Sequence, residues 1–189
     1  MKKTKTILII LIMLIMMTVL VAGCQSSSPQ SDEQNTPPAD QRFLVAGIGL
    51  GDSTDEVKKV LGDEYTNEFL DEGWFGEPTS CWLYGDDVEV LIGEESNAVF
   101  QINLYSDGYT TSAGDKVGAK AQDVLPAYED KYPLAQDHFE GNELPGWFVV
   151  EEGEWLIFNY KDDGTLVNQP IEAEDEVKSI HLVYEKFMH

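Results

Sequence analysis

Alternating apolar and polar residues predict six β-strands in this chain, arranged as two groups of three. The strands are expected at Thr79–Tyr84, Val88–Gly93 and Ala98–Tyr105 in the first group, and at Trp147–Val150, Glu154–Tyr160 and Val177–Tyr184 in the second. The turn sequences GDD and EEG join the first two strands of each group, so each group begins with a predicted hairpin. Antiparallel pairing is therefore expected.

A helix is predicted upstream of the first group, in the segment GDSTDEVKKVLG. Ser53 suits the N-cap position, and Glu56, three residues later, can complete a capping box. An apolar stripe with helical spacing begins at Val57. Gly62 fits just past the end of the helix, where a residue without a Cβ is favoured.

This helical segment has a second copy. GLGDSTDEVKKVLGDEY at 49–65 is echoed by KVGAKAQDVLPAYEDKY at 116–132, with Gly51 aligned on Gly118 at an offset of 67 residues. In the copy, Lys120 replaces the capping serine and Pro126 removes an interior hydrogen bond, so that helix should be short, kinked or differently started. We therefore expect an α+β fold built as a tandem repeat.

In this predicted fold, a helical segment plus three antiparallel strands occurs at 42–112 and again at 113–189. Either unit alone would expose an apolar sheet face and helix stripe, whereas two units together can close a core. We expect the two repeats to form one domain, with the helices packed on one face of the sheet.

The repeated motif resembles the segment that opens each repeat of the beta-lactamase-inhibitory proteins and, one copy at a time, of the small outer-membrane assembly lipoproteins. The matching residues are Gly49, Gly51, Ser53, Glu56, Val57, Leu61 and Gly62 in the first copy, and Gly118, Asp123, Val124 and Tyr128 in the second. The resemblance covers 48–184 at motif level and implies fold more than function. The known inhibitors bind an enzyme on a concave sheet face, but their contact residues cannot be carried onto this chain.

The N-terminus predicts export and lipid anchoring. Three lysines within the first five residues precede an apolar run from Ile7 to Ala22, which is short for a membrane span but suits a signal peptide. The run ends in LVAGC, which resembles the lipobox of bacterial lipoproteins. The resemblance implies a signal peptide at 1–23, a diacylglycerol on Cys24, and a location at the cell membrane facing the extracytoplasmic side. An ordinary membrane anchor is the alternative.

Residues 24–41 contain no large apolar side chain after Cys24, so we expect a disordered tether. All 35 acidic residues but only nine of the twelve basic ones follow Cys24, which gives that part a formal charge of −26. Such a charge disfavours nucleic acid and favours a cationic partner or Ca²⁺. Simple solubility is the alternative explanation.

Candidate chemistry is sparse. Cys81 is the one cysteine left after Cys24 and is expected to be a small buried strand residue rather than a nucleophile. The three histidines lack zinc spacing, and His181 is expected to be a partly covered surface or edge residue. The acidic loops Tyr160–Gly164 and Glu172–Glu176 could hold Ca²⁺, but they lack EF-hand spacing, so solvated turns are favoured. We predict no catalytic residues, no metal ligands and no cofactor beyond the lipid.

Aromatic residues give the better hint. Trp74 and Phe75 lie in a glycine-flanked loop that need not be buried, and strand alternation sends some of the other aromatic residues to a sheet face that the helices cannot cover. Burial in the core is the alternative for each of them. The predicted partner-binding residues are Trp74, Phe75, Trp82, Tyr84, Trp147 and Trp155. The sequence thus favours a non-enzymatic, lipid-anchored protein that recognises a protein or peptide, in particular a cationic one. The alternatives are a carbohydrate-active enzyme with paired carboxylates and a structural lipoprotein of envelope assembly.

Overall fold

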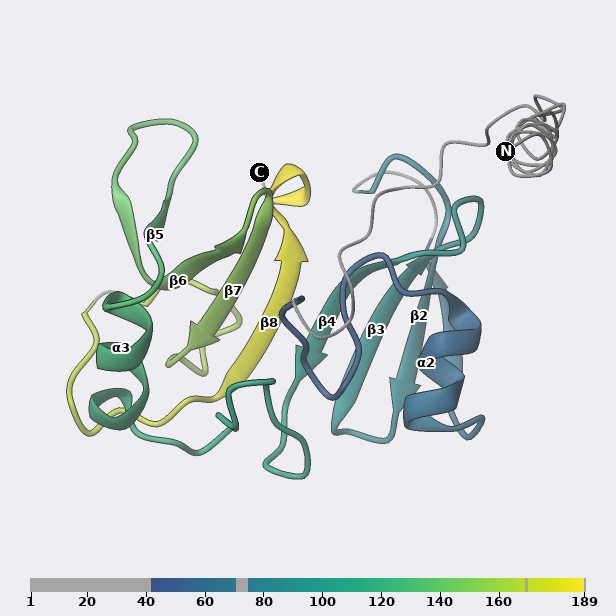
Figure 1. Ribbon diagram of the computed structural model, residues 1–189, viewed down its shortest axis with the longest axis horizontal. Helices are drawn as coiled ribbons and strands as arrows, with labels where there is room; N and C mark the ends of the chain where they lie inside the picture. The colour runs from purple at the N-terminus through teal and green to yellow at the C-terminus, as the bar shows by residue number, and fades with distance from the viewer. Residues whose placement is uncertain (1–41, 71–74, 169, 189) are drawn as a thin grey trace, which may run out of the picture. The chain divides into compact units, whose positions relative to one another are not determined.

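A computed structural model of the chain describes residues 42–70, 75–168 and 170–188, which belong to one compact unit, Thr36–His189 (Figure 1). The predicted signal peptide, Cys24 and the tether lie outside the described residues, as does Trp74. Across the described ranges no helix is both long enough and apolar enough to span a bilayer.

The unit is built on a single eight-stranded antiparallel sheet with the order β1-β2-β3-β4-β8-β7-β6-β5. Its strands are β1 (Thr66–Leu70), β2 (Thr79–Tyr84), β3 (Val88–Gly93), β4 (Val99–Leu104), β5 (Leu134–Gln136), β6 (Glu143–Glu151), β7 (Glu154–Asn159) and β8 (Ser179–Tyr184). The described helices are α2 (Thr54–Leu61), α3 (Ala121–Glu129) and the 3-10 turn η1 (Glu185–Phe187).

The predicted fold class, an α+β tandem repeat of a helix plus three strands, is wrong. The structure is a β-rich fold in which one sheet holds all eight strands and the two α-helices are short. Two strands were missed, β1 and β5, and they form the two edges of the sheet. β1 has five exposed residues and β5 only three residues in all, so neither shows the half-buried alternation by which strands are found in a sequence.

Five of the six predicted strands agree closely with the observed ones, and so does the first helix, whereas the predicted Trp147–Val150 covers only part of β6. Ser53 accepts a hydrogen bond from the Glu56 backbone N–H, while the Glu56 carboxylate accepts one from the Ser53 N–H, which completes the predicted capping box. In α3, Lys120 makes no side-chain cap and Pro126 lies inside the helix. Because α3 has no side-chain cap and contains an interior proline, its stability must come from packing against the sheet rather than from local helix propensity.

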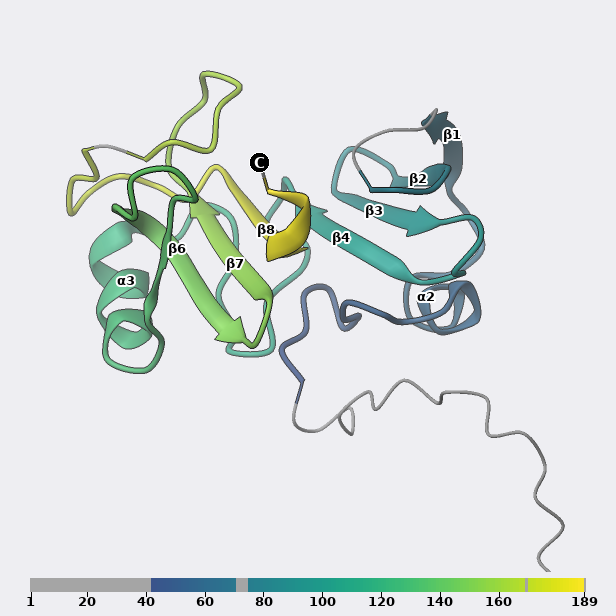
Figure 2. The same cartoon turned by 90° about the horizontal axis from the view of Figure 1, so that it is seen from above.

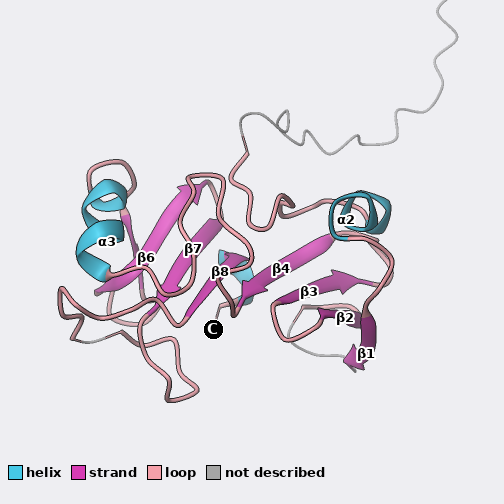
Figure 3. Ribbon diagram, turned by 90° about the horizontal axis from the view of Figure 1, so that it is seen from below, coloured by secondary structure: helices cyan, strands magenta, loops and turns pink. Residues whose placement is uncertain are grey.

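We call the sheet face that packs against both helices the inner face. Its core includes Val57 from α2, Val124 and Tyr128 from α3, and the alternating residues of six strands. Figures 2 and 3 show α2 near the β2–β4 half of the sheet and α3 beside β6. The fully buried strand residues of this face include Val90, Ile102, Leu104, Phe148, Leu156, Phe158, Ile180 and Leu182.

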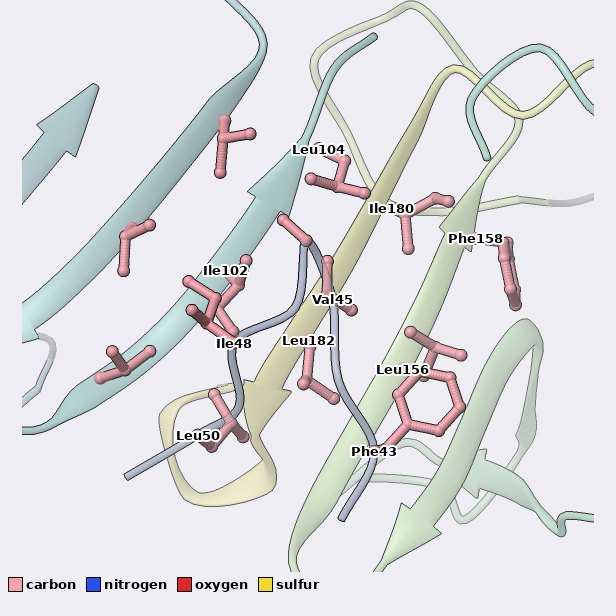
Figure 4. Close-up of a cluster of buried hydrophobic side chains, with 14 of the residues drawn as sticks. Phe43, Val45, Ile48, Leu50, Ile102, Leu104, Leu156, Phe158, Ile180 and Leu182 are labelled. Carbon is pink, nitrogen blue, oxygen red and sulfur yellow. The ribbon is translucent and has the colours of Figure 1, made fainter. Parts of the chain in front are cut away.

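The chain segment 43–50 crosses the middle of the inner face. Figure 4 shows Phe43, Val45 and Ile48 directed at the side chains of β4, β8 and β7. Val45 and Ile48 have no exposed surface, and their backbones pair with each other in a tight turn. The two halves of the sheet, which meet where β4 pairs with β8, therefore share one core.

We call the opposite side of the sheet the outer face. Paired residues on antiparallel strands point the same way, so the register defines its members. Asn103 pairs with His181, His181 with Ile157, and Ile157 with Trp147. The central part of this face is polar, whereas its β6–β7 end is aromatic and carries a second, smaller apolar cluster around Trp147 and Trp155.

Candidate functional site

A row of hydrogen-bonded polar side chains crosses the centre of the outer face. Ser179 Oγ lies 2.7 Å from His181 Nε2, and His181 Nδ1 lies 2.7 Å from Asn103 Oδ1. Gln101 Nε2 donates to the same Asn103 oxygen over 2.8 Å, and Asn159 Nδ2 lies 3.4 Å from Ser179 Oγ. We call these five side chains the polar row.

The expectation that His181 would be a partly covered surface residue is wrong. Its side chain lies on a central strand and is only 5% exposed. Burial lowers the pKa of the imidazole to about 4, so His181 is neutral at neutral pH. A neutral buried histidine needs hydrogen-bond partners on both ring nitrogens, and Ser179 and Asn103 supply them.

The loop that follows β7 runs beside the polar row and is fixed by Asn168. The buried Asn168 side chain accepts a hydrogen bond from the Tyr160 N–H and donates to the carbonyls of Phe158 and Pro145. Gly146 makes this approach possible, because a Cβ there would come within 2.9 Å of both Asn168 Nδ2 and the Phe158 oxygen. Gly146 also has a φ of +80°, which favours glycine.

A cavity of about 240 Å³ opens between this loop and the polar row. Its lining residues are Tyr105, Asn159, Lys161, Asp162, Gly164, Thr165, Leu166, Lys178, Ser179 and His181. Two lysines therefore flank one cavity in a chain with few cations. The Tyr105 ring packs edge-on against His181 at 6.1 Å between centroids, and its hydroxyl donates to Glu89 over 3.2 Å.

A second cavity, of about 140 Å³, lies at the aromatic end of the outer face. It is lined by Asp137, His138, Phe139, Leu144, Trp147, Trp155 and Met188, and we call it the tryptophan pocket. His138 stacks on Trp155, and Trp155 meets Trp147 edge-on. Trp147 Nε1 donates to the Leu166 carbonyl over 3.0 Å, so its one polar atom is satisfied.

Asp137 organises the loop that carries Phe139 over this pocket. Its carboxylate accepts backbone hydrogen bonds from Phe139 at 2.9 Å, Glu140 at 2.6 Å and Asn142 at 2.9 Å. These bonds, the one from Glu140 first, lower the pKa of Asp137, so the carboxylate stays ionised. Phe139 is nevertheless 90% exposed, which places a large apolar ring in solvent at the rim of the pocket.

The six aromatic residues that the sequence singled out do not form one surface. Trp82 and Tyr84 are buried in the inner-face core, whereas Trp147 and Trp155 line the tryptophan pocket on the outer face. Phe75 packs between Phe100 and Phe187, and Trp74 lies outside the described residues. The structure thus brings two of the predicted residues together and adds Phe139.

Sequence reasoning missed the polar row. Its signal was present, because QIN in β4 and SIH in β8 each place two polar residues two positions apart and therefore on one sheet face. What the sequence could not supply is the pairing of Asn103 with His181, which are 78 residues apart. Phe139 was missed because an isolated aromatic residue in a loop has no pattern.

A third cavity, of about 390 Å³, lies at the edge of the inner-face core, and Arg42, Lys131, Tyr132 and Glu151 are among its lining residues. Arg42 is committed to an ion pair with Asp52 at 2.7 Å, and Glu151 accepts from the Phe43 N–H at 3.1 Å. Next to Glu151, Glu154 has its pKa raised to about 7 by burial and by the neighbouring carboxylate.

The remaining candidates behave as structural residues. Cys81 is buried on β2, and burial raises the pKa of its thiol to about 12, which leaves it protonated and unreactive. In the first acidic loop, Asp163 accepts hydrogen bonds from the Thr165 N–H and hydroxyl, as a turn residue does. The described part of the chain contains no group of three or more His, Cys, Asp or Glu residues that could hold a metal ion.

Comparison of the chain with protein-family models, with curated proteins and with solved structures finds no match. The resemblance to inhibitory proteins and assembly lipoproteins therefore stays a prediction, and the function must be argued from this chain's own residues.

Proposed function

We propose that this is a lipid-anchored protein of the cell membrane whose extracytoplasmic domain recognises a cationic protein or peptide at the tryptophan pocket. The observation that carries the proposal is the exposure of Phe139. Its side chain is 90% exposed, its backbone N–H is hydrogen-bonded to Asp137, and it lies at the rim of a pocket that Trp147 and Trp155 also line. The lipid anchor at Cys24 is part of the same proposal and rests on the N-terminal sequence.

The size of the pocket favours a side chain over a small-molecule ligand. Sites for drug-sized ligands enclose roughly 300–1,000 Å³, whereas the tryptophan pocket encloses about 140 Å³. A cavity of this size suits a single anchoring side chain of a larger partner. Aromatic pockets of this kind are where protein interfaces concentrate their binding energy.

The charge of the domain favours a cationic partner. The loop 137–143 contains Asp137, Glu140 and Glu143, of which Asp137 lines the pocket, and the chain after Cys24 carries a formal charge of −26. An arginine or lysine entering the pocket would meet the ionised carboxylate of Asp137 and the rings of Trp147 and Trp155, both of which attract cations. The proposal assigns recognition rather than chemistry to this pocket.

The proposal is tested with the mature chain, Gln25–His189, immobilised through its N-terminus. Secreted and envelope fractions of the source cell are passed over it at low and then moderate salt, and each retained protein is purified and titrated against the soluble chain. We expect a cationic partner whose affinity falls at least tenfold in Phe139→Ser. Because Phe139 is 90% exposed, this change should leave the fold intact.

Phe69→Ser is the matched control, since Phe69 is also an exposed phenylalanine, 63% exposed, but lies on β1 at the far edge of the sheet. It should bind as the unmodified chain does. A partner that binds both variants equally, or whose binding does not weaken with salt, would refute the proposed site.

A further inference from the structure

We propose that Ser179 is an activated nucleophile, with His181 as its general base and Asn103 as the residue that positions the base, and that the 240 Å³ cavity admits small acyl esters to it. This inference goes beyond the proposed recognition function and uses a different part of the outer face. The class of reaction is acyl transfer to the serine, followed by hydrolysis.

The geometry is that of a nucleophile, a base and an orienting group in sequence. Ser179 Oγ is 2.7 Å from His181 Nε2, and the other ring nitrogen is 2.7 Å from Asn103 Oδ1. Both distances fall within the range over which a base takes a proton from a nucleophile and is held by a third group. Ser179 and His181 are two residues apart on β8, so their side chains share the outer face.

The hydrogen bonds around Asn103 determine which nitrogen of His181 carries the proton. Asn103 Oδ1 accepts from Gln101 Nε2, which can only donate, so this oxygen must also be the acceptor for His181. His181 therefore carries its hydrogen on Nδ1. Nε2 is left with a free lone pair facing the Ser179 hydroxyl, which is the tautomer that a general base needs.

The serine can be reached from the cavity. Ser179 and His181 both line it, although each is only about 5% exposed, so a reagent meets the nucleophile from one side. A volume of about 240 Å³ is below that of sites for drug-sized ligands, which limits the acyl group to a short one. Lys161, Lys178 and Asp162 line the same cavity, and Lys178 is paired with Glu176 at 3.4 Å, so the lining does not select for the charge of the ester.

In the proposed reaction, Ser179 Oγ attacks the acyl carbon of the ester while its proton passes to His181 Nε2. The carbon–oxygen bond to the leaving group breaks, and the protonated His181 returns the proton to the departing alkoxide. Water then attacks the acyl-serine with His181 as base, which releases the acid and regenerates Ser179. The Asn159 amide lies 3.4 Å from Ser179 Oγ and also donates to the Lys161 carbonyl at 3.1 Å, and in the proposed reaction it turns to the developing oxyanion.

The experiment measures covalent labelling of the purified chain by a small fluorophosphonate, with the modified residue located by peptide mass spectrometry. In that reaction the serine oxygen displaces fluoride from phosphorus, and the serine proton leaves with the fluoride as HF. Hydrolysis of p-nitrophenyl acetate is followed in parallel. We expect labelling at Ser179 alone and ester turnover that the label abolishes.

Ser179→Ala should remove both signals, and His181→Gln should slow labelling about 100-fold or more, the least that a general base contributes. Ser80→Ala is the matched control, because Ser80 is an equally buried strand serine bonded to a glutamate instead of a histidine. It should label like the unmodified chain. Circular dichroism of each variant shows whether it has folded.

The pH profile separates a catalytic role from a merely structural one. Because His181 is already neutral throughout, labelling should stay level from pH 8 to about pH 5.5 and fall only as His181 takes up a proton. Asn103→Asp places a carboxylate beside Nδ1, raises the pKa of His181 and should move this fall to higher pH. No labelling of the folded, unmodified chain, or labelling that survives Ser179→Ala, overturns the inference and leaves the Phe139 proposal untouched.

Discussion

The two faces of the one sheet are built on opposite principles. On the inner face, residues such as Ile102, Leu182 and Leu156 alternate along adjacent strands and are fully buried against the helices and segment 43–50. The residues between them on the same strands point to the outer face, and they include Asn103, His181 and Ile157. A single strand, β8, thus carries both kinds of environment.

The comparison shows that the inner face supplies most of the stability, whereas the outer face carries the polar side chains that could react or bind. Apolar burial needs no particular partner, so the inner face can close around any well-shaped set of side chains. The polar row needs every donor matched to an acceptor, because an unmatched buried group is costly. The outer face, which carries the buried polar row beside a cavity, is therefore more informative about function than the inner face.

The largest expected effect is on the inner face. Phe158→Ala removes a ring with no exposed surface and should lower the free energy of unfolding by about 3–5 kcal/mol. Urea denaturation followed by circular dichroism measures the change. A loss below about 1 kcal/mol would show that the inner face is not the main source of stability.

A smaller effect is expected from breaking the polar row. His181→Leu leaves the Ser179 hydroxyl and the Asn103 amide without their common partner and should cost about 1–3 kcal/mol. The triple change Ser179→Ala, His181→Leu and Asn103→Leu removes all three groups and should be less destabilising than the sum of the single changes. Additive losses in urea titrations would argue against a connected row.

One titrating group on each face should make the free energy of unfolding depend on pH, and the two dependences should have opposite signs. His181 has its pKa lowered from 6.5 to about 4, so between those values the unfolded chain binds more protons and stability falls with falling pH. Glu154, on the inner face, has its pKa raised from 4.5 to about 7, so there the folded chain binds more protons and its contribution is lost as pH rises.

The pH comparison uses Glu154→Gln and His181→Gln, with the free energy of unfolding measured between pH 4.5 and 7. Relative to the unmodified chain, Glu154→Gln should steepen the loss of stability toward acid, and His181→Gln should flatten or reverse it. Each difference can approach about 1.4 kcal/mol per pH unit at most, the value for one proton. Parallel curves for all three proteins would contradict both assignments.

The smallest effect on stability is expected at the rim of the tryptophan pocket. Phe139→Ser should change the free energy of unfolding by no more than about 0.5 kcal/mol, because the ring is exposed. The same variant is expected to lose partner affinity at least tenfold. A large loss of stability in thermal unfolding would mean that Phe139 serves packing instead of recognition.

Much of the local structure could be predicted, because its causes are local. The capping box at Ser53 and Glu56 and the strands β2, β3 and β7 follow from short-range patterns that the structure reproduces. The edge strands β1 and β5 could not be found this way, since a strand that buries little has no alternation to display. That omission is why the fold class was misjudged.

The candidate site was predicted only in part. Trp147 and Trp155 were singled out for their type and alternation, and they do line a pocket. Trp82 and Tyr84 were chosen on the same grounds but lie on the inner face, where the helices cover them. Alternation shows that two residues share a face, but not which face will be covered.

The sequence by itself therefore determined the elements with strong local signals, the acidic character of the chain after Cys24, and the expectation of export. The tertiary structure alone decided that β4 and β8 join the two halves into one sheet, and that Asn103 meets His181. The physical reason is range. Capping, periodicity and charge act between residues a few positions apart, whereas register and burial depend on partners that only the folded chain brings together.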